Sequence, residues 1–287
     1  MYLAGLFQYP LKSGRAIARQ AADIRLDGMS GDRRLMLVDD KGQGVTQRDL
    51  PALAAVVASV EGDQATLHFG GNQVSASFEP TRRLSVTVWS SPVDAALAPE
   101  AVNATLSGWF SQSLRLVQMD GQAARLAGGD WAGAPVPVGF ADEYPLLVTT
   151  TGSLAALNAT LAERGEPAVG MDRFRTNLLI AHDVPWDEDL WEAVEIGGVR
   201  IDLVKPCTRC IVTTQDQETG ARTGGNPIPA LSRTRMSGDR RVVGVLFGWN
   251  AVPRGEGRLS VGEPVRVLSR RAEAWPMRQP GQRREGP

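Results

Sequence analysis

Alternating apolar and polar residues predict β-hairpins in the first third of the chain. Apolar side chains recur at every second position over 65–69 and again over 74–78, with glycine and asparagine between the two runs. This period of two is typical of strands that have one face on a core and are joined by a tight turn. Segments 35–38 and 45–48 flank another polar turn in the same way. The alternating run 84–88 is expected to continue the meander.

The apolar pattern changes to helical spacing in two places. Apolar residues from Val102 to Phe110 recur three and four positions apart, which predicts a helix. A second helix is predicted over 154–161, with Ser153 as its N-cap and Gly165 just beyond its end.

A later hairpin leads to the cysteines of the chain. Apolar alternation over 194–196 and 199–203 flanks a Gly-Gly pair, which favours a two-residue turn. The second of these strands runs toward Cys207, and the β-branched run 211–214 favours a further strand. The pattern as a whole predicts a β-rich, mixed α+β fold with few helices.

Composition and charge narrow the class of protein. The chain has 287 residues, of which 43% are hydrophobic, so it can bury a sizeable core in one or two domains. Its formal net charge of -1 gives no reason to expect nucleic acid or an anionic membrane as a partner. No apolar stretch approaches the length of a membrane span, and residues 1–10 lack the features of a secretory signal. We therefore expect a cytoplasmic protein.

Cys207 and Cys210 form a CxxC motif and are the only cysteines of the chain. A tetrahedral zinc site needs four ligands, and the two histidines, His68 and His182, are isolated in the sequence. A four-cysteine iron–sulfur cluster cannot be built from two cysteines. A thioredoxin-type CxxC opens a helix, whereas the run 211–214 favours a strand. A structural pair, a disulfide or one functional thiolate with a bystander remains.

Several further polar motifs occur in a fixed order along the chain. They are Tyr9-Pro10-Leu11-Lys12-Ser13, Gly28-Met29-Ser30-Gly31-Asp32-Arg33-Arg34, Thr46-Gln47-Arg48, Gly152-Ser153-Leu154, Arg173-Phe174-Arg175-Thr176-Asn177 and Phe247-Gly248-Trp249-Asn250. With the CxxC, this set resembles the MOSC family, named for the C-terminal domain of molybdenum cofactor sulfurase, preceded by its N-terminal β-barrel domain. The resemblance runs from about Leu3 to Leu268.

The resemblance implies two domains. An N-terminal β-barrel-like domain is expected over residues 1–118, followed over residues 119–271 by a MOSC β-barrel domain with peripheral helices, which holds the cofactor site. After Leu268 the composition turns to arginine, proline, glycine and glutamine. Residues 272–287 are therefore predicted to be a disordered tail.

Four cations are candidates for an anion site. Lys12, Arg33, Arg48 and Arg175 each follow or lie beside a predicted strand and turn, where side chains from separate loops converge on one cleft. Guanidinium groups bind phosphate oxygens in pairs, and lysine supplies a point charge. One such residue alone is more often an ordinary surface cation. The resemblance implies that the anion is the phosphate of molybdopterin.

The resemblance also implies that the second cysteine, Cys210, binds molybdenum. A soft thiolate suits a metal that two dithiolene sulfurs already hold. The neighbouring Arg209 and Lys205 are expected to favour deprotonation of Cys210. Cys207 is interpreted as a small, packed supporting residue.

Three polar residues are predicted to hydrogen-bond the cofactor: Ser13, Ser153 and Asn177. For Ser153, capping of the second helix is an equal alternative. Asp183 lies where related proteins often carry an acid near the metal, and as a catalytic residue it would relay protons, although it could equally form a turn. His182 is interpreted as structural.

The resemblance implies a molybdenum oxidoreductase that reduces N-hydroxylated compounds, namely amidoximes, hydroxylamines and N-hydroxylated bases, to amines. The alternative is a molybdenum-cofactor-binding protein or a persulfide sulfur carrier that uses Cys210. The sequence has no Gly-x-Gly-x-x-Gly motif after a strand. We expect no internal iron–sulfur cluster, haem or flavin, and a separate electron donor such as a ferredoxin or flavodoxin with its reductase.

Overall fold

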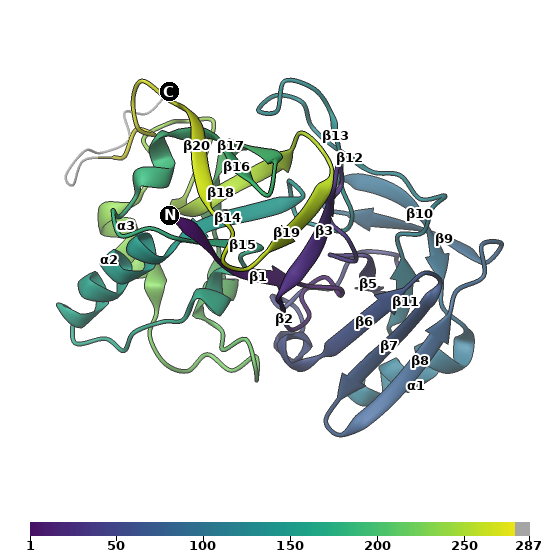
Figure 1. Ribbon diagram of the computed structural model, residues 1–287. Coiled ribbons are helices and arrows are strands. Elements are labelled where there is room, and N and C mark those ends of the chain that lie inside the picture. Colours follow the sequence, from purple (N-terminus) through teal and green to yellow (C-terminus); the bar gives the residue numbers. More distant parts are fainter. Residues whose placement is uncertain (279–287) are drawn as a thin grey trace.

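A computed structural model describes residues 1–278 of the chain. These residues form twenty strands in five sheets, three α-helices and four 3-10 helices. The helices are α1 (Glu100–Phe110), α2 (Thr151–Ala162) and α3 (Pro227–Thr234). Two groups of strands lie side by side, with α2 and α3 at the outer edge of one group and α1 against the other (Figure 1). The predicted β-rich, α+β fold class is confirmed.

The largest sheet has eight strands in the order β2-β1-β15-β14-β18-β17-β16-β20. Its members are β1 (Tyr2–Gln8), β2 (Ile17–Arg19), β14 (Leu146–Thr150), β15 (Leu178–Ala181), β16 (Trp191–Ile196), β17 (Val199–Arg209), β18 (Val245–Pro253) and β20 (Val265–Arg270). Only β14 and β15 pair in parallel, and α2 makes the crossover that parallel strands require. The predicted Gly-Gly hairpin joins β16 to β17, as expected.

Two further sheets build the second group of strands. One is a meander of β6 (Val57–Glu61), β7 (Gln64–Phe69) and β8 (Asn72–Ser77). The other has the strand order β5-β11-β10-β9, and its strands are β5 (Leu35–Val38), β9 (Arg83–Val88), β10 (Ser91–Leu97) and β11 (Arg115–Gln118). The hairpin predicted around Gly70 is confirmed. Residues 84–88 form a strand as predicted, within β9, but β9 pairs with β10 and does not extend the meander of β6, β7 and β8, so that part of the prediction was wrong.

Two predicted strands are absent from the described residues. Segment 45–48 is a loop, in which Asp49 Oδ2 accepts hydrogen bonds from the backbone and hydroxyl of Thr46. Segment 211–214 forms the 3-10 helix η4 (Ile211–Thr214), because Thr213 and Thr214 donate their hydroxyls to carbonyls three residues earlier. Local side-chain bonds thus replace strand pairing in both places.

Small sheets and short helices complete the described chain. They are β3 (Ala21–Arg25), β4 (Gly28–Met29) and β19 (Gly257–Ser260) in one sheet, β12 (Leu126–Ala127) and β13 (Val136–Pro137) in another, and the 3-10 helices η1 (Pro51–Ala55), η2 (Met171–Phe174) and η3 (Asp187–Leu190).

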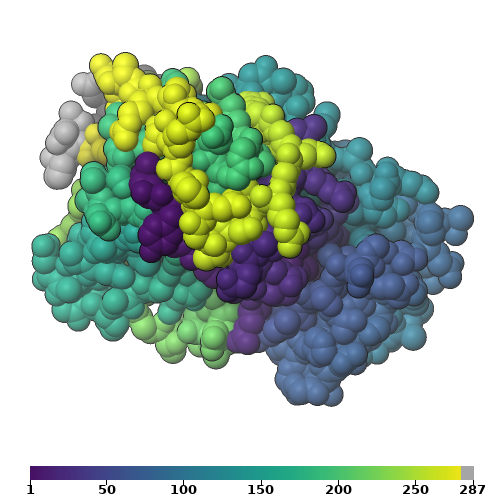
Figure 2. Space-filling view, in the orientation of Figure 1, coloured from purple at the N-terminus to yellow at the C-terminus, as the bar shows by residue number. Residues whose placement is uncertain are grey.

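The first strands of the chain are built into the sheets of its later half. Strand β1 pairs with β15, Leu3 N donates to Glu263 O over 2.9 Å, and β3 pairs with β19. The N-terminal and C-terminal segments therefore lie side by side on one face (Figure 2). The boundary after residue 118 stays a prediction, and the backbone pairing ties the two predicted domains together.

The predicted loose tail, residues 272–287, falls partly outside the described residues, which end at 278. Within the described part, Trp275 Nε1 donates to Ser237 Oγ over 3.1 Å. Its ring lies 5.6 Å from the ring of Trp131 and 6.1 Å from that of Trp249. Trp275 thus packs against the fold, whereas residues 272–274 are exposed, and the loose tail stays a prediction.

Candidate functional site

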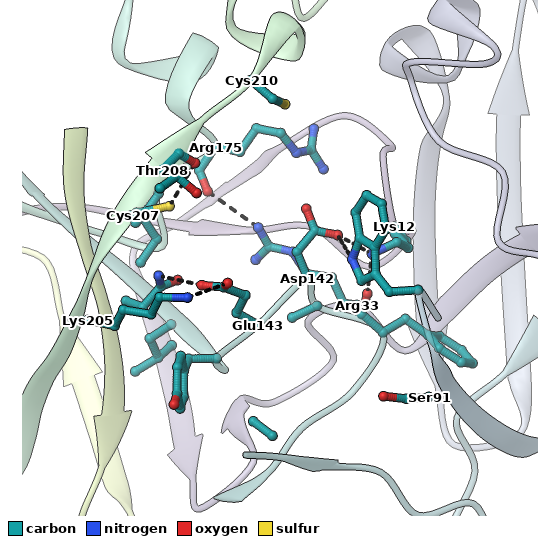
Figure 3. A pocket seen from close by; sticks show the side chains of 18 of the residues that line it. Lys12, Arg33, Ser91, Asp142, Glu143, Arg175, Lys205, Cys207, Thr208 and Cys210 are labelled. Atoms are coloured by element: carbon teal, nitrogen blue, oxygen red, sulfur yellow. Dashed lines mark hydrogen bonds and ion pairs between the residues drawn. The ribbon is translucent and has the colours of Figure 1, made fainter. Parts of the chain in front are cut away.

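A pocket of about 790 Å³ lies where the two groups of strands meet. Its lining residues, some of which Figure 3 shows as sticks, come from the loops after β1, β4, β5 and η2, the β9–β10 hairpin, the connection from β11 to β14, and strands β17 and β18. The predicted residues Lys12, Ser13, Arg33, Arg48, Arg175, Asn177 and Cys210 all line this pocket. The structure therefore brings together seven residues from five separate segments of the sequence.

Parallel pairing of β14 with β15 explains which predicted residues reach the pocket. Residues just before two parallel strands lie at the same edge of the sheet, and residues just after them lie at the opposite edge. Arg175 and Asn177 come before β15 and line the pocket. Ser153 and Asp183 come after β14 and β15 and are not part of its lining.

Ser153 and Asp183 therefore differ from the prediction. Thr150 is the N-cap of α2, and the buried Ser153 Oγ accepts from Thr150 Oγ1 (2.9 Å) and from Trp186 N (2.8 Å). Asp183 is exposed in the loop after β15. His182 is not part of the pocket lining, and its Nε2 lies 2.9 Å from Asp187 Oδ2.

The two cysteines are free and have different cationic partners. Arg48 Nη2 donates to Cys210 Sγ over 3.0 Å. Arg209 Nη1 instead donates to Cys207 Sγ over 2.9 Å. The prediction that Arg209 and Lys205 act on Cys210 was wrong, because Lys205 Nζ bonds Glu143 Oε1 over 2.7 Å.

Cys207 has a structural environment, as the sequence suggested. Burial raises the pKa of the Cys207 thiol, and the charge of Arg209 opposes this shift. Arg209 is itself fixed by Phe174, whose carbonyl accepts from Nη2 over 2.6 Å. Cys210 follows β17 as the N-cap of η4, is half-buried and contacts one of the predicted cations, Arg48.

Two arginines pack against one buried tyrosine ring. The guanidinium carbons of Arg33 and Arg175 lie 4.2 and 4.3 Å from the centre of the Tyr9 ring. Both arginines have left-handed backbones, with φ of 45° and 56°. Such conformations cost about 1–3 kcal/mol each and tend to be kept at functional sites. Burial raises the pKa of Tyr9 to about 12 and lowers that of Arg175 to about 10.

Arg175 has an unused donor. Its Nη1 donates to Gly14 O (2.8 Å) and Gln217 Oε1 (3.1 Å), whereas Nη2 is buried with no acceptor in the described part of the protein. A buried donor without a partner is costly, and more so when charged. An anionic oxygen in the pocket would satisfy it, so the residues present fit a phosphate-bearing ligand.

Lys12 and Asn177 hold parts of this site in place. Lys12 Nζ donates to Phe140 O (2.8 Å) and Asp142 Oδ1 (2.5 Å); burial lowers the pKa of Lys12 and Asp142 opposes this. Asn177 Oδ1 accepts from Arg33 Nη1 over 3.1 Å. Both groups of the Asn177 amide are bonded within the protein, so this residue orients Arg33.

Two of the pocket carboxylates, Asp142 and Glu143, lie next to each other and were missed from the sequence. They lie just before Tyr144-Pro145 and the apolar strand β14, which is the available signal for a loop residue at a sheet edge. Arg125 fixes this loop by donating to Gly139 O, Ala141 O and Asp142 O at 2.9, 2.6 and 3.2 Å.

The family models match both halves of the chain. The MOSC N-terminal beta barrel domain matches residues 1–115, and the MOSC domain matches residues 135–266. This chain belongs to the MOSC family. The family resemblance predicted from the motifs is confirmed, and the connection 116–134 between the two matches supplies part of the pocket wall of this MOSC protein.

The relatives of this MOSC protein include amidoxime-reducing components and a molybdenum cofactor sulfurase. It is 28% identical to human mitochondrial amidoxime-reducing component 1 over 93% of this chain and 82% of that protein. It is 29% identical to human mitochondrial amidoxime reducing component 2, over 92% and 82%. Zebrafish (Danio rerio) molybdenum cofactor sulfurase is 25% identical, over 81% of this chain and 30% of that protein.

Residues 1–278 lack two kinds of feature, a cluster of metal-binding side chains and a helix that could span a membrane. Within that range, no group of three or more His, Cys, Asp or Glu side chains could hold a metal ion. In the same part of the chain, the helices are all too short or too polar to cross a membrane.

Proposed function

We propose that this MOSC protein is a molybdenum-cofactor-dependent oxidoreductase that reduces N-hydroxylated compounds to amines. The observation that carries the proposal is the pocket itself, in which Cys210 contacts Arg48, three further cations line the walls and one buried guanidinium nitrogen has no acceptor among the described residues. The similarity to amidoxime-reducing components over most of the chain supports the reaction type.

In this proposal Cys210 and the four predicted cations each have a task. Cys210 is the protein ligand of molybdenum, and Arg48 places a positive charge against its sulfur. Lys12, Arg33 and Arg175 bind the phosphate, with Arg175 Nη2 as the free donor. When bound, the molybdenum cofactor supplies the two-electron chemistry that removes oxygen from nitrogen.

The protein would also supply protons to the reaction. Reduction of an N–OH group consumes two electrons and two protons, leaves an N–H group and releases water. Burial opposes ionisation of Asp142, but the charge of Lys12 and the hydrogen bond from its Nζ lower the pKa of Asp142, so this group at the pocket wall is a carboxylate. Asp142 replaces Asp183 as the proton-relaying carboxylate of the proposal, because Asp183 is not part of the pocket lining.

The test is cofactor analysis combined with turnover. Protein made in a molybdenum-replete host should carry molybdenum and pterin in equal amounts, and it should reduce benzamidoxime with a low-potential dye as electron source. Bound cofactor without turnover on any N-hydroxylated compound would rule out the reductase.

The second candidate is a persulfide carrier. It is favoured by the similarity to molybdenum cofactor sulfurase, of which this chain matches less than a third. A carrier would show a persulfide on Cys210 by mass spectrometry and no tightly bound molybdenum. These results are opposite to those expected of the reductase.

Two further parts of the proposal concern the cellular setting. The reductase takes electrons from a separate protein, a ferredoxin or flavodoxin with its reductase, and acts in the cytoplasm. Co-purification of such a donor and fractionation of the cells test these two points.

A further inference from the structure

A second charged cluster lies in the same pocket, away from the cations around Tyr9. Glu143 Oε1 accepts from Lys205 Nζ over 2.7 Å, and Glu143 Oε2 accepts from Asn250 Nδ2 over 3.2 Å. In Figure 3 Glu143 and Lys205 lie on the side of Cys207, whereas Lys12 lies on the far side; with Asn250 they form the acidic subsite (Glu143, Lys205 and Asn250). The tasks proposed for the cofactor cations leave it unused.

The acidic subsite is built on paired strands. Lys205 on β17 lies directly across from Asn250 on β18, and Glu143 reaches them from the loop before β14. The Lys205 side chain is 16% exposed, whereas that of Glu143 is 41% exposed. A carboxylate has about four lone-pair positions, and two are in use here. Glu143 is thus held firmly with acceptor capacity left for a ligand.

Carboxylates and cations both lie at this end of the pocket. Burial raises the pKa of Tyr144, and Glu143 and Asp130 both raise it further, so two carboxylates lie near this hydroxyl. Lys205 pairs with Glu143, and Arg209 contacts Cys207. The acceptor positions that Glu143 has left favour a ligand with N–H donors.

Apolar side chains line the pocket beside these carboxylates. Leu126 is 61% exposed and belongs to the pocket lining, as does Trp131. Trp131 packs in the same apolar cluster as Tyr144 and Val204, the residues next to Glu143 and Lys205. A ligand with a flat apolar body and a donor head group fits this surface.

We infer that the acidic subsite binds the amidine head of the substrate and product, with Glu143 as the specificity-determining residue. The inference rests on the proposed function. An amidoxime keeps an amino group on the carbon that bears the N–OH group, and its amidine product is a cation with two nitrogen donors. Both can donate to the free positions of Glu143. Substrates with no N–H, such as aromatic N-oxides, gain nothing from this residue.

Binding of benzamidine tests the subsite without turnover. Titration calorimetry on the molybdenum-loaded protein should show binding that Glu143→Gln weakens about tenfold or more. Glu163→Gln, on the exposed C-cap of α2, should bind like the wild type. Lys205→Met, which keeps the carboxylate but removes its cation, should bind at least as tightly as the wild type.

Three results would overturn the inference. The first is that the wild type does not bind benzamidine, and the second is that Glu143→Gln binds it as tightly as the wild type. The third is that Glu143→Gln and Lys205→Met weaken binding equally, which would mean that the ion pair only stabilises the fold. In turnover, Glu143→Gln should raise KM for benzamidoxime about tenfold and leave KM for pyridine N-oxide unchanged. If the wild type reduces neither compound, the proposed function fails, while the calorimetry still decides the subsite.

Discussion

The two thiols of the CxxC motif have different surroundings, although only two residues separate them. Arg48 contacts Cys210 from a loop that lies 162 positions away, whereas Arg209 contacts Cys207 from the same strand. Alternation along β17 explains this, because residues two apart share a face of the strand. Chemistry at Cys210 therefore depends on tertiary structure, whereas the contact at Cys207 is local.

Replacement of each cysteine by serine should separate their roles. Cys210→Ser is expected to lose molybdenum and reductase activity while the protein stays folded, because no other thiol faces the cations. Cys207→Ser is expected to retain most activity, since its sulfur serves packing and one hydrogen bond. Circular dichroism, metal analysis and dye-linked turnover check both variants. The ligand assignment is wrong if Cys207→Ser is the inactive one.

Glu188 gives a prediction for stability against pH. Its side chain is buried under the start of α2, burial raises its pKa to about 7, and Oε1 has no partner among the described residues. The folded protein therefore holds this proton more tightly than the unfolded chain, whose pKa is near the ordinary 4.5. Folding is favoured at low pH by this group, and the advantage disappears as the pH rises from 4.5 to 7.

Glu188→Gln should remove that dependence. Relative to the wild type, the variant is expected to gain free energy of unfolding between pH 5 and pH 8, at most on the order of 3 kcal/mol. Urea denaturation of both proteins at the two pH values measures the difference. A gain that is the same at pH 5 and pH 8 would show that Glu188 does not titrate as described.

At the scale of elements, α2 depends on a close approach at its first turn. A Cβ added to Gly152 would lie 2.6 Å from His182 O and 2.8 Å from Asp183 O, both of them backbone atoms. The first turn of α2 thus packs directly on the loop after β15, and this contact fixes the crossover between the two parallel strands.

Gly152→Ala is expected to destabilise the protein by about 1–3 kcal/mol, because the backbone atoms cannot move apart freely. Gly108→Ala in α1 is the matched control, since a Cβ there has no neighbour within 4 Å. That change should be neutral or stabilising by up to about 1 kcal/mol, as alanine is favoured in helices. Thermal unfolding of the two variants gives the comparison. If Gly152→Ala left the free energy of unfolding unchanged, the loop after β15 would have moved to make room for the added methyl group.

At the scale of the whole molecule, the purified protein should lack a route from NADH to molybdenum. Its sequence has two cysteines, both in the CxxC motif, and no dinucleotide-binding glycine motif after a strand. Cofactor-loaded protein with NADH and benzamidoxime is expected to be inert, and addition of a low-potential dye should start turnover. Steady NADH consumption without the dye would reveal an internal electron-transfer site.

The sequence motifs contained several of the residues that line the pocket. Lys12, Arg33, Arg48 and Arg175 all line it, because each sits at the end of a strand or turn that faces one cleft. The sequence could not choose between Asp142 and Asp183, since both flank an apolar strand. That choice depends on β14 and β15 being parallel neighbours, which no local pattern records.

Pairing of β1 with β15 also has a consequence for how the protein is made. Leu6 leaves the ribosome long before Leu178, its partner in the sheet. Until then, the first strand has an unpaired edge, which is a site for misfolding and aggregation. The large sheet can close only after β20 has been synthesised, when the segment before it reaches β1, so slow synthesis or premature truncation before β20 should lower the yield.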